Sequence, residues 1–235
     1  MTERVFYQED SPWVEMKGMS WPTLTEGQVC KRFSKGHILY NQQEFCEDVY
    51  IIQRGRVAMC LCTPNGGMRI AVILNEGCMF GHQTLFDNNP NSCQALVISD
   101  EGASIYIVPK LLVQEKIKTD YNIVYNMLAQ SNKINRMLLT QIELMSFQRS
   151  ESRVCFYLMH MADQYSYQQG KHKVLHLRFT HQDIADASGL SRVCVSNVIS
   201  GLIKNDILQK KSGTYMVTDI EKLRERYRSP MYVEM

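Results

Sequence analysis

The residues best suited to chemistry lie between positions 180 and 202, where polar side chains recur at helical spacing. Arg192 has the geometry for a bidentate hydrogen bond to guanine, Asn197 for one to adenine, and Val193 for contact with a thymine methyl group. A contact to the sugar-phosphate backbone, or plain solvent exposure, explains any one of these side chains about as well. Taken together, the pattern favours the reading of base edges in duplex DNA.

Two short helices joined by a sharp turn would position these side chains. Thr180 is a good N-cap residue, and Asp183, three residues later, completes an arrangement like a capping box. Gly189 can adopt the left-handed conformation that ends the first helix, and Ser191 can cap the second. The apolar residues expected to anchor the second helix in a core are Leu190, Val195, Val198 and Leu202. The segment predicts a helix-turn-helix whose second helix enters a major groove, although a purely structural helix pair would share this shape.

Residues 207–217 support this prediction because they alternate as two strands around a turn at Ser212 and Gly213. A strand pair after a helix-turn-helix makes a winged helix, with Lys210 and Lys211 placed on the wing to contact phosphates. The predicted DNA contacts are Thr180, His181, Ser191, Arg192, Val193, Cys194, Ser196, Asn197, Lys210 and Lys211. No catalytic residue is predicted.

The distribution of charge agrees with a polyanionic partner for the C-terminal part. Residues 1–170 carry 15 Lys and Arg against 17 Asp and Glu, whereas residues 171–235 carry 11 against 7, so the net charge changes from −2 to +4. A basic segment beside a nearly neutral one is typical of proteins that bind nucleic acid.

Composition excludes a disordered or membrane-spanning chain. Of the 235 residues, 45% are hydrophobic and 21% are charged, which is enough for a large core. No run reaches the roughly 18 apolar residues of a membrane helix, and residues 1–10 lack the apolar core of a signal peptide. We therefore expect a cytoplasmic protein without a membrane partner, whose eight cysteines are mostly reduced thiols.

The period of the apolar pattern changes from strand to helix along the chain. Between residues 29 and 108, short apolar runs such as 49–52, 57–62 and 69–74 alternate with Gly-containing turns. Strands at this spacing predict an antiparallel roll or sandwich. The pair Asn65-Gly66 supplies the positive φ of a tight hairpin between two of them.

From Lys118 the pattern predicts a helix of about 28 residues, or roughly 40 Å. Its apolar stripe consists of Ile123, Met127, Ile134, Met137, Leu138, Gln141, Leu144 and Met145. A stripe of this length exceeds what a small sheet domain can bury, which favours a coiled-coil-like seam with a second copy. Packing within one domain is the alternative. Another helix is predicted to begin at Ser150.

Several local motifs carry a resemblance to a known family. They are Phe33-Ser34-Lys35-Gly36, residues 50–57, Asn75-Glu76-Gly77, Phe80-Gly81, Arg153 near the start of the next helix, and the helix-turn-helix. In this order, over about residues 29–218, the chain resembles the CRP/FNR family of bacterial transcription regulators.

The resemblance implies an α+β fold in three parts. An antiparallel, cupin-like and cyclic-nucleotide-binding-like β-roll would sense an effector (residues 1–117), a long helix would form the dimer (118–148), and a winged helix-turn-helix would bind DNA (149–235). It also implies a homodimer on a two-fold related operator, a small-molecule effector held between the roll and the long helix, and contact with RNA polymerase. The protein would be an effector-responsive transcription regulator and not an enzyme.

Departures from the family pattern predict an unusual effector and operator. Where cyclic-nucleotide sensors carry a Glu for the ribose and an Arg-Ser pair for the phosphate, this chain has His82, Ser92 and Cys93. A buried cyclic phosphate without its arginine would be an unpaired charge, so we predict that the effector is not cyclic AMP. The purine-facing helix positions read Leu138 and Leu139 instead of hydroxyl residues.

Two further features depart from the family pattern. Cys30 is the one cysteine before Cys46, which argues against the N-terminal iron–sulfur cluster of other members. Val193 and Asn197 replace the common Glu and Arg on the DNA-reading face, so the operator should differ from the usual half-site.

The effector remains an unknown small molecule, and the resemblance places it beside two groups of residues. The roll would contribute Gly81, His82, Gln83, Thr84, Ser92 and Gln94, and the long helix Tyr125, Asn132, Lys133 and Arg136. If Lys133 or Arg136 faces the cavity, the effector is an anion, such as the aromatic acids bound by halophenol-sensing relatives. Otherwise both cations lie on a solvated flank of the helix. Trp13 and Trp21 either close the cavity or pack onto the roll.

Other sensing chemistries use the same scaffold. His82 could ligate haem or a metal, although a lone histidine is more often an ordinary polar residue. Oxidation of Cys194 would disturb DNA docking, whereas Cys60 and Cys62, two residues apart on one strand, have poor disulfide geometry. A cupin-like metal enzyme would need more ligands than His37 and His82. A DNA-binding subunit with a vestigial sensor is the last alternative.

Overall fold

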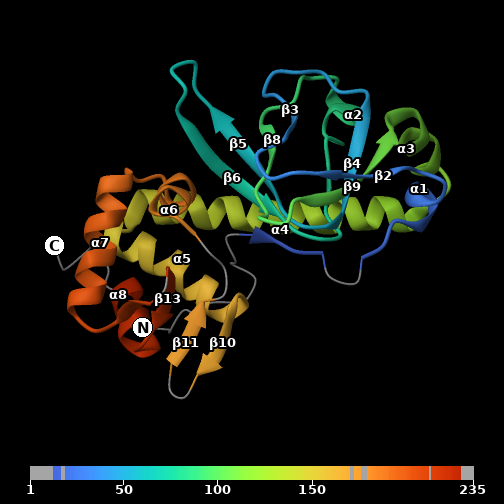
Figure 1. Ribbon diagram of the computed structural model, residues 1–235. Coiled ribbons are helices and arrows are strands. Elements are labelled where there is room, and N and C mark those ends of the chain that lie inside the picture. The colour runs from blue at the N-terminus through green and yellow to red at the C-terminus, as the bar shows by residue number, and fades with distance from the viewer. Residues whose placement is uncertain (1–12, 17–18, 170–171, 176–178, 212, 229–235) are drawn as a thin grey trace, which may run out of the picture. The chain divides into compact units, whose positions relative to one another are not determined.

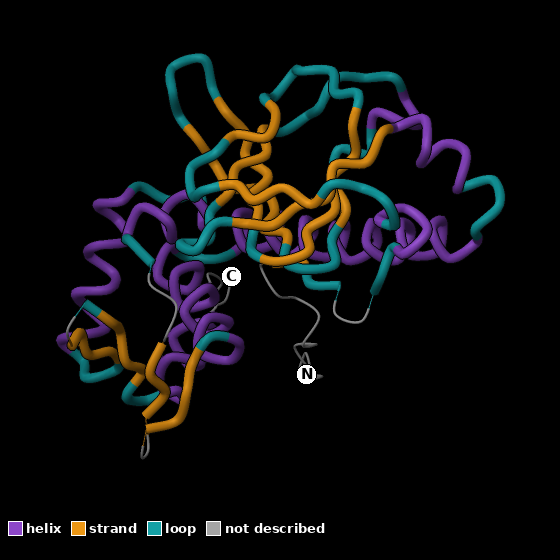
Figure 2. The backbone as a smooth tube through the Cα atoms, turned by 45° about the vertical axis from the view of Figure 1, so that its right-hand side comes forward, coloured by secondary structure: helices purple, strands orange, loops and turns teal. Residues whose placement is uncertain are grey.

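The apolar runs predicted between residues 29 and 108 form two facing sheets in the computed structural model, which describes residues 13–16, 19–169, 172–175, 179–211 and 213–228. The first sheet contains, in order, β1 (Trp13–Val14), β6 (Met68–Leu74), β5 (Val57–Cys62), β8 (Gln94–Val97) and β3 (Ile38–Tyr40). The second contains β2 (Cys30–Phe33), β9 (Ala103–Pro109), β4 (Asp48–Arg54) and β7 (Met79–Phe80). All pairs are antiparallel except β1 with β6. Figure 2 shows these strands in orange.

Strand β4 is buried on both of its faces from Val49 to Ile52, which explains its unbroken apolar run. Tyr50 and Ile52 point into the core between the two sheets, together with residues of β5, β6, β8 and β9. Val49 and Ile51 point to the opposite face, where α1 (Pro22–Thr25), α3 (Lys110–Lys116) and a long helix cover the sheet. Because side chains alternate along a strand, a strand buried on both faces is apolar at every position. A short helix α2 (Thr84–Asp87) follows β7.

The long helix, α4, runs from Tyr121 to Phe147 and is 27 residues long, which confirms the helix predicted from Lys118. Its first part lies along the β-roll (Figure 1), where Ile123, Met127 and Met137 are buried in the two cores of the roll. The predicted apolar stripe is therefore largely buried inside the chain itself: Gln141 and Leu144 are buried too, and Met145 is exposed.

The C-terminal part is a helix bundle with one antiparallel sheet. Its helices are α5 (Ser150–Gln164), α6 (His181–Ser188), α7 (Arg192–Lys204) and α8 (Ile220–Arg228). Its strands, in sheet order, are β10 (Ser166–Gln169), β11 (His172–Leu175), β13 (Thr214–Val217) and β12 (Leu208–Lys211). Helix α5 begins at the predicted Ser150 and supplies the centre of this core, with Val154, Leu158 and Met161 buried.

These elements confirm an α+β fold with an antiparallel β-roll, a long helix and a winged helix-turn-helix. By its internal contacts the chain separates into two compact units, residues 1–138 and 139–235. The functional limits predicted at residues 117 and 148 stay a prediction. Ser212 of the predicted wing turn and the N-terminal residues 1–10 lie outside the described residues. Within the described part of the chain, no helix is long and apolar enough to span a membrane.

Candidate nucleic-acid interface

Helix α6 begins with a complete capping box and ends at the predicted glycine. The backbone N–H of Asp183 donates to Oγ1 of Thr180 (3.1 Å), and the backbone N–H of Thr180 donates to Oδ2 of Asp183 (2.6 Å). Gly189 has a φ of +65°, a left-handed conformation that costs glycine little. Ser191 caps α7 by accepting a hydrogen bond from the N–H of Cys194 (3.2 Å). The local signals of the helix-turn-helix are thus confirmed.

Helix α5 fixes the turn between α6 and α7. The hydroxyl of Tyr157 donates to the carbonyl of Ala187 (2.5 Å), and Nη1 of Arg153 donates to the carbonyl of Ser188 (3.3 Å). Both carbonyls belong to the last turn of α6, where the helix itself provides no partner. The two bonds therefore attach the end of α6 to the core helix.

Helix α7 has one buried face and one exposed face. Val195, Ile199 and Leu202 are almost fully buried, at the four- and three-residue spacing of one helical face. The sequence prediction placed Val198 in this core, but the structure leaves Val198 half-buried and buries Ile199. Leu190 is also only half-buried.

The opposite face of α7 presents side chains suited to DNA. Arg192, Val193 and Asn197 are exposed, and Val193 leaves 69% of its surface to solvent. Lys210 and Lys211 are exposed on the neighbouring strand β12. An exposed apolar residue between polar ones is expected of a surface that contacts both base edges and thymine methyl groups.

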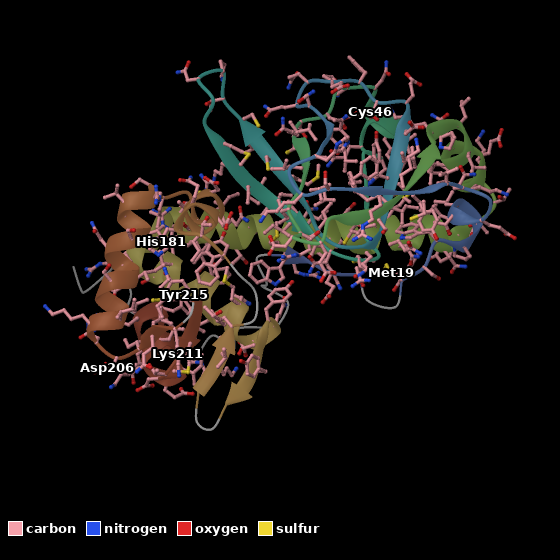
Figure 3. The ribbon with its side chains drawn as sticks, viewed as in Figure 1. Met19, Cys46, His181, Asp206, Lys211 and Tyr215 are labelled. Carbon is pink, nitrogen blue, oxygen red and sulfur yellow. The ribbon has the colours of Figure 1, made fainter. Side chains whose placement is uncertain are left out.

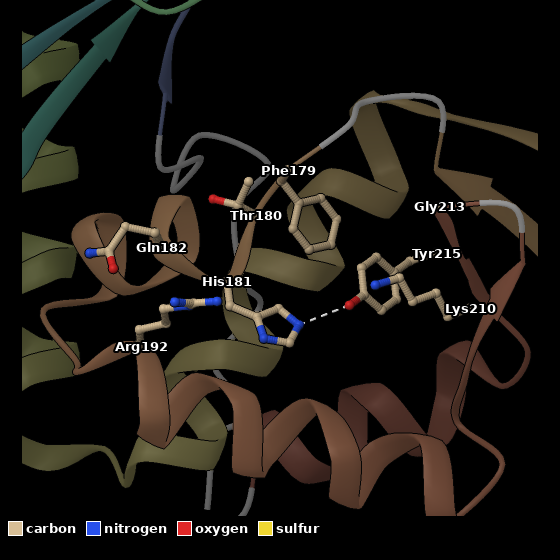
Figure 4. Close-up of a pocket in the computed structure, with 8 residues that line it drawn as sticks. All are labelled: Phe179, Thr180, His181, Gln182, Arg192, Lys210, Gly213 and Tyr215. Carbon is tan, nitrogen blue, oxygen red and sulfur yellow. Dashed lines mark hydrogen bonds between the residues drawn. The ribbon is translucent and has the colours of Figure 1, made fainter.

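A hollow of about 550 Å³ lies between the two helices and the wing (Figure 4). It is lined by residues 179–182 around the start of α6, by Arg192 at the start of α7, and by Lys210, Gly213 and Tyr215 of the wing. Two cations and no carboxylate are among these lining residues. The hollow is therefore suited to an anion.

His181 connects three elements at the base of this hollow. Its Nδ1 lies 2.6 Å from Oγ of Ser196 on α7, and its Nε2 lies 2.8 Å from Oη of Tyr215 on β13. Figure 3 shows His181 and Tyr215 side by side in the C-terminal unit, and Figure 4 shows the bond between them. Partial burial, and then the nearby charges of Lys210 and Arg192, lower the pKa of His181.

The predicted DNA contacts are not all brought together. Thr180, His181, Arg192 and Lys210 line the hollow, whereas Ser196 is half-buried and bonded to His181. Their roles toward DNA stay predictions. Phe179, Gln182 and Tyr215 also line the hollow and were missed by the sequence analysis. The available sequence signal was the strand alternation of residues 214–217, which puts Tyr215 on the same face as Val217. The structure buries both side chains.

The predicted effector residues are placed very differently from one another. Gly81, His82 and Thr84 are buried, and Gln94 is half-buried. The exposed members of the set are Gln83, Ser92, Tyr125, Asn132, Lys133 and Arg136. Nζ of Lys133 donates to the carbonyl of Glu15 (3.2 Å), so its ammonium group lies at the N-terminal segment. An anionic effector was expected only if Lys133 or Arg136 faces the cavity, and this contact of Lys133 does not support that condition.

The two tryptophans pack onto the roll and are almost fully buried. Trp13 lies in β1 beside β6, and Nε1 of Trp21 donates to the carbonyl of Gly77 (2.9 Å). Trp21 also lines a second hollow of about 360 Å³, together with Met16 and Met19. The lining of that hollow contains none of the predicted effector residues.

Comparison with known proteins agrees with this architecture. Residues 30–120 match the model of the cyclic nucleotide-binding domain, and residues 152–226 match that of the Crp-like helix-turn-helix domain. The cyclic AMP receptor protein of Thermus thermophilus is 23% identical over 194 residues, which cover 82% of this chain and 85% of that protein. The CRP-like cAMP-activated global transcriptional regulator of Mycobacterium tuberculosis is 22% identical over 207 residues, covering 83% and 87%.

A solved structure shows the same fold. The c-di-GMP-responsive global regulator CLP of Xanthomonas campestris superposes with a TM-score of 0.75 at 14% identity, over 84% of this chain and 97% of that protein. Both halves of the family architecture are therefore present in one chain, in the family's order. The chain belongs to the CRP/FNR family. It is a transcription regulator with a helix-turn-helix DNA-binding domain, and members of this family are not enzymes.

Within this CRP/FNR-family regulator, the loop that follows β7 is built without a cationic phosphate partner. Gly81 has a φ of +77°, and a Cβ there would lie 3.2 Å from the ring of Tyr50 and 3.3 Å from the carbonyl of Asp48. Burial lowers the pKa of His82 to about 4, so its imidazole is neutral near pH 7. Among the described residues, no three His, Cys, Asp or Glu side chains are arranged to hold a metal ion.

Gln130 of α4 is hydrogen-bonded to β7, the strand that precedes this loop. Its Oε1 accepts a hydrogen bond from the N–H of Met79 (2.8 Å), and its Nε2 donates to the carbonyl of Met79 (2.6 Å). Met79 lies on β7, at the edge of the second sheet, and Gln130 is only 1% exposed. The side-chain amide of Gln130 therefore pairs with the backbone groups of Met79 at the free edge of β7, two residues before Gly81. No sequence pattern predicted this contact.

We expect Gln130→Leu to destabilise the β-roll by about 3 kcal/mol, because it leaves a buried N–H and a buried carbonyl unpaired. Both tryptophans of the chain lie in the β-roll unit and are buried. Urea unfolding followed by tryptophan fluorescence therefore reports on this unit alone. Gln83→Leu, at an exposed position without a capping hydrogen bond, is the control. Equal midpoints for the two variants would contradict the role of Gln130.

Proposed function

We propose that this chain is a homodimeric, effector-responsive transcription regulator of the cytoplasm, which binds a two-fold related operator and contacts RNA polymerase. The observation that carries the proposal is the exposed face of α7. Arg192 and Asn197 are exposed there, while Val195, Ile199 and Leu202 hold the opposite face in the core. A capped second helix with this division of faces is suited to insertion into a major groove.

The interface separates into groups with different expected roles. Arg192 and Asn197 lie on the helix that would enter the groove, so we assign them to guanine and adenine edges. Lys210 and Lys211 lie on the wing, outside that helix, so we assign them to phosphates. Phosphate contacts supply salt-dependent affinity, whereas base contacts supply the sequence preference.

Helix α4 supports the homodimer because it carries a second apolar stripe that the chain leaves exposed. Its exposed apolar members are Tyr121, Tyr125, Leu128, Leu139 and Ile142. With the exposed Asn132 and Asn135 between them, these residues alternate at steps of four and three, which is the spacing of a coiled-coil seam. Polar residues at central seam positions are a common means of fixing register and partner number. We therefore place the dimer contact on this second stripe.

The loop after β7 supports a small polar effector other than cyclic AMP. Nδ1 of His82 and Oδ1 of Asn91 are buried and have no hydrogen-bond partner among the described residues. An unpaired buried polar atom costs about 1–3 kcal/mol, which a bound ligand would recover. A neutral His82 and an exposed Ser92 provide no cation for a cyclic phosphate, since Arg is the residue suited to that role.

The coupling in this proposal runs through Gln130. A ligand that moves residues 81–94 would act on β7, whose backbone at Met79 is bonded to α4. Because α4 also carries the proposed dimer seam, the effector would change how two copies of the helix pair. A ligand shifts such an equilibrium only through its differential affinity for the two states.

We expect Arg192→Ala and Lys210→Ala to weaken DNA binding in different ways. With duplexes selected in vitro for the wild type, Arg192→Ala should reduce the preference for selected over scrambled DNA by roughly tenfold or more. Lys210→Ala should weaken both duplexes equally and lower the salt slope by about one per protomer. Lys31→Ala, on the exposed strand β2, is the control. Uniform losses from both variants, measured by fluorescence anisotropy, would refute this assignment of roles.

Leu139→Glu should convert the dimer into monomers, because it places a charge in the seam without disturbing the fold. Leu139 is 65% exposed in the single chain, so the substitution removes little intramolecular packing. Leu111→Glu is a matched control, since Leu111 is 74% exposed on α3 and outside the seam. Sedimentation equilibrium should show a monomer for the first variant and a dimer for the second. A dimeric Leu139→Glu protein would exclude this seam.

Cyclic AMP at about 1 mM should leave the thermal midpoint of the β-roll unchanged, whereas a true effector should raise it. A ligand present at 100 times its Kd adds about 2.7 kcal/mol to the stability of the native state, which corresponds to several degrees in Tm. Tryptophan fluorescence again reports the β-roll. A rise of several degrees with cyclic AMP would contradict the proposed effector class. No rise across a panel of small polar compounds would favour a vestigial sensor.

A further inference from the structure

The hollow between α6, α7 and the wing contains more chemistry than a row of phosphate-binding lysines. Lys210 and Arg192 line it, and so do His181 and Tyr215, which are bonded to each other. The Tyr215 side chain is buried and held in place: Phe179 stacks on its ring at 5.0 Å, and Nζ of Lys210 lies 5.3 Å from the ring centroid. The hydroxyl of Tyr215 therefore has a fixed position at His181.

The protonation state of His181 decides where the hydroxyl protons can point. A neutral imidazole has one N–H donor and one acceptor nitrogen, so one of the hydroxyls of Ser196 and Tyr215 must donate to the ring. An imidazolium donates from both nitrogens, which leaves both hydroxyls as acceptors toward the ring. Each hydroxyl proton is then available to another acceptor, and Tyr215 lines the hollow.

The surroundings of His181 favour the neutral form in the free protein. Partial burial lowers the pKa of His181, and the positive charges of Lys210 on β12 and Arg192 on α7 act in the same direction. The acid nearest in sequence, Asp183 of α6, has its carboxylate bonded to the N–H and hydroxyl of Thr180. Tyr215 faces His181 from β13 through its hydroxyl group.

An anion in the hollow would oppose the part of this preference that comes from the two cations. A phosphodiester group between Lys210 and His181 would offset the repulsion from the two cations and would accept the hydroxyl proton of Tyr215. Both effects favour the imidazolium form. By linkage, a ligand that raises the proton affinity of a group binds more tightly at lower pH.

We propose that the hollow is a binding site for one backbone phosphate of duplex DNA, and that His181 takes up a proton when this phosphate binds. His181 is then a positioning residue, which acts through the hydroxyls of Tyr215 and Ser196 and not through a base edge. This inference rests on the proposed DNA-binding function. It adds that DNA binding is coupled to the protonation of His181.

The test is the pH dependence of duplex binding by the full-length protein at constant ionic strength. Fluorescence anisotropy with a labelled duplex of mixed sequence, about 30 base pairs long, should show Kd falling by roughly three- to tenfold per protomer between pH 7.5 and 5.5. His181→Gln keeps a neutral donor and acceptor but cannot titrate, so its Kd should be nearly independent of pH. Tyr215→Phe should also lose most of the dependence. His37→Gln, at an exposed position in the β-roll, should keep it.

Nuclear magnetic resonance provides a readout that a purely structural role would not move. The imidazole signals of His181, assigned by their loss in His181→Gln, should titrate at a higher pH when the duplex is added. An unchanged titration, a pH-independent wild-type Kd, or an unaltered pH dependence in His181→Gln would each overturn this inference while leaving DNA binding in place. Failure to bind any duplex at low salt would overturn the proposed function as well.

Discussion

Helix α4 has two apolar stripes, and the rest of the protein depends on how each is covered. Ile123, Met127 and Met137 are buried in the cores of the β-roll, so the helix cannot leave the roll without exposing them to water. Tyr125 and Leu139 belong to the second stripe and are exposed. One helix therefore takes part in the cores of the β-roll and in the proposed dimer seam. A change in its packing on one side must alter what it presents on the other.

Gln130 adds directional hydrogen bonds to the packing of α4 on the β-roll. Hydrophobic contacts tolerate small displacements because they are non-directional, whereas hydrogen bonds weaken steeply when distance or angle changes. The paired bonds between Gln130 and Met79 fix α4 against one edge strand, two residues before Gly81. The loop where we propose that the effector binds follows this strand directly, so directional contacts connect its start to the helix.

In the DNA-binding domain, one set of residues supports the helix-turn-helix and another set is exposed for contact with DNA. Tyr157 and Arg153 hold the last carbonyls of α6, and the buried face of α7 completes the support. Arg192, Val193 and Asn197 remain free of the core, so they can vary without loss of stability. The helix pair can therefore stay fixed while the side chains on its exposed face change. Tyr215 and His181 combine both properties: packing and hydrogen bonds fix their side chains, and both side chains also line the hollow.

The amino-acid sequence by itself determined the features that depend on neighbours close in the chain. The capping box at Thr180 and Asp183, the left-handed Gly189, the strand pair of the wing and the long helix were predicted because each involves residues a few positions apart. Only the tertiary structure decided that Ile199 and not Val198 is buried, that Gln130 meets Met79, and that His181 joins Ser196 to Tyr215. These contacts connect residues 15 to 51 positions apart, or depend on the exact rotation of a helix over its core, and local spacing does not specify either.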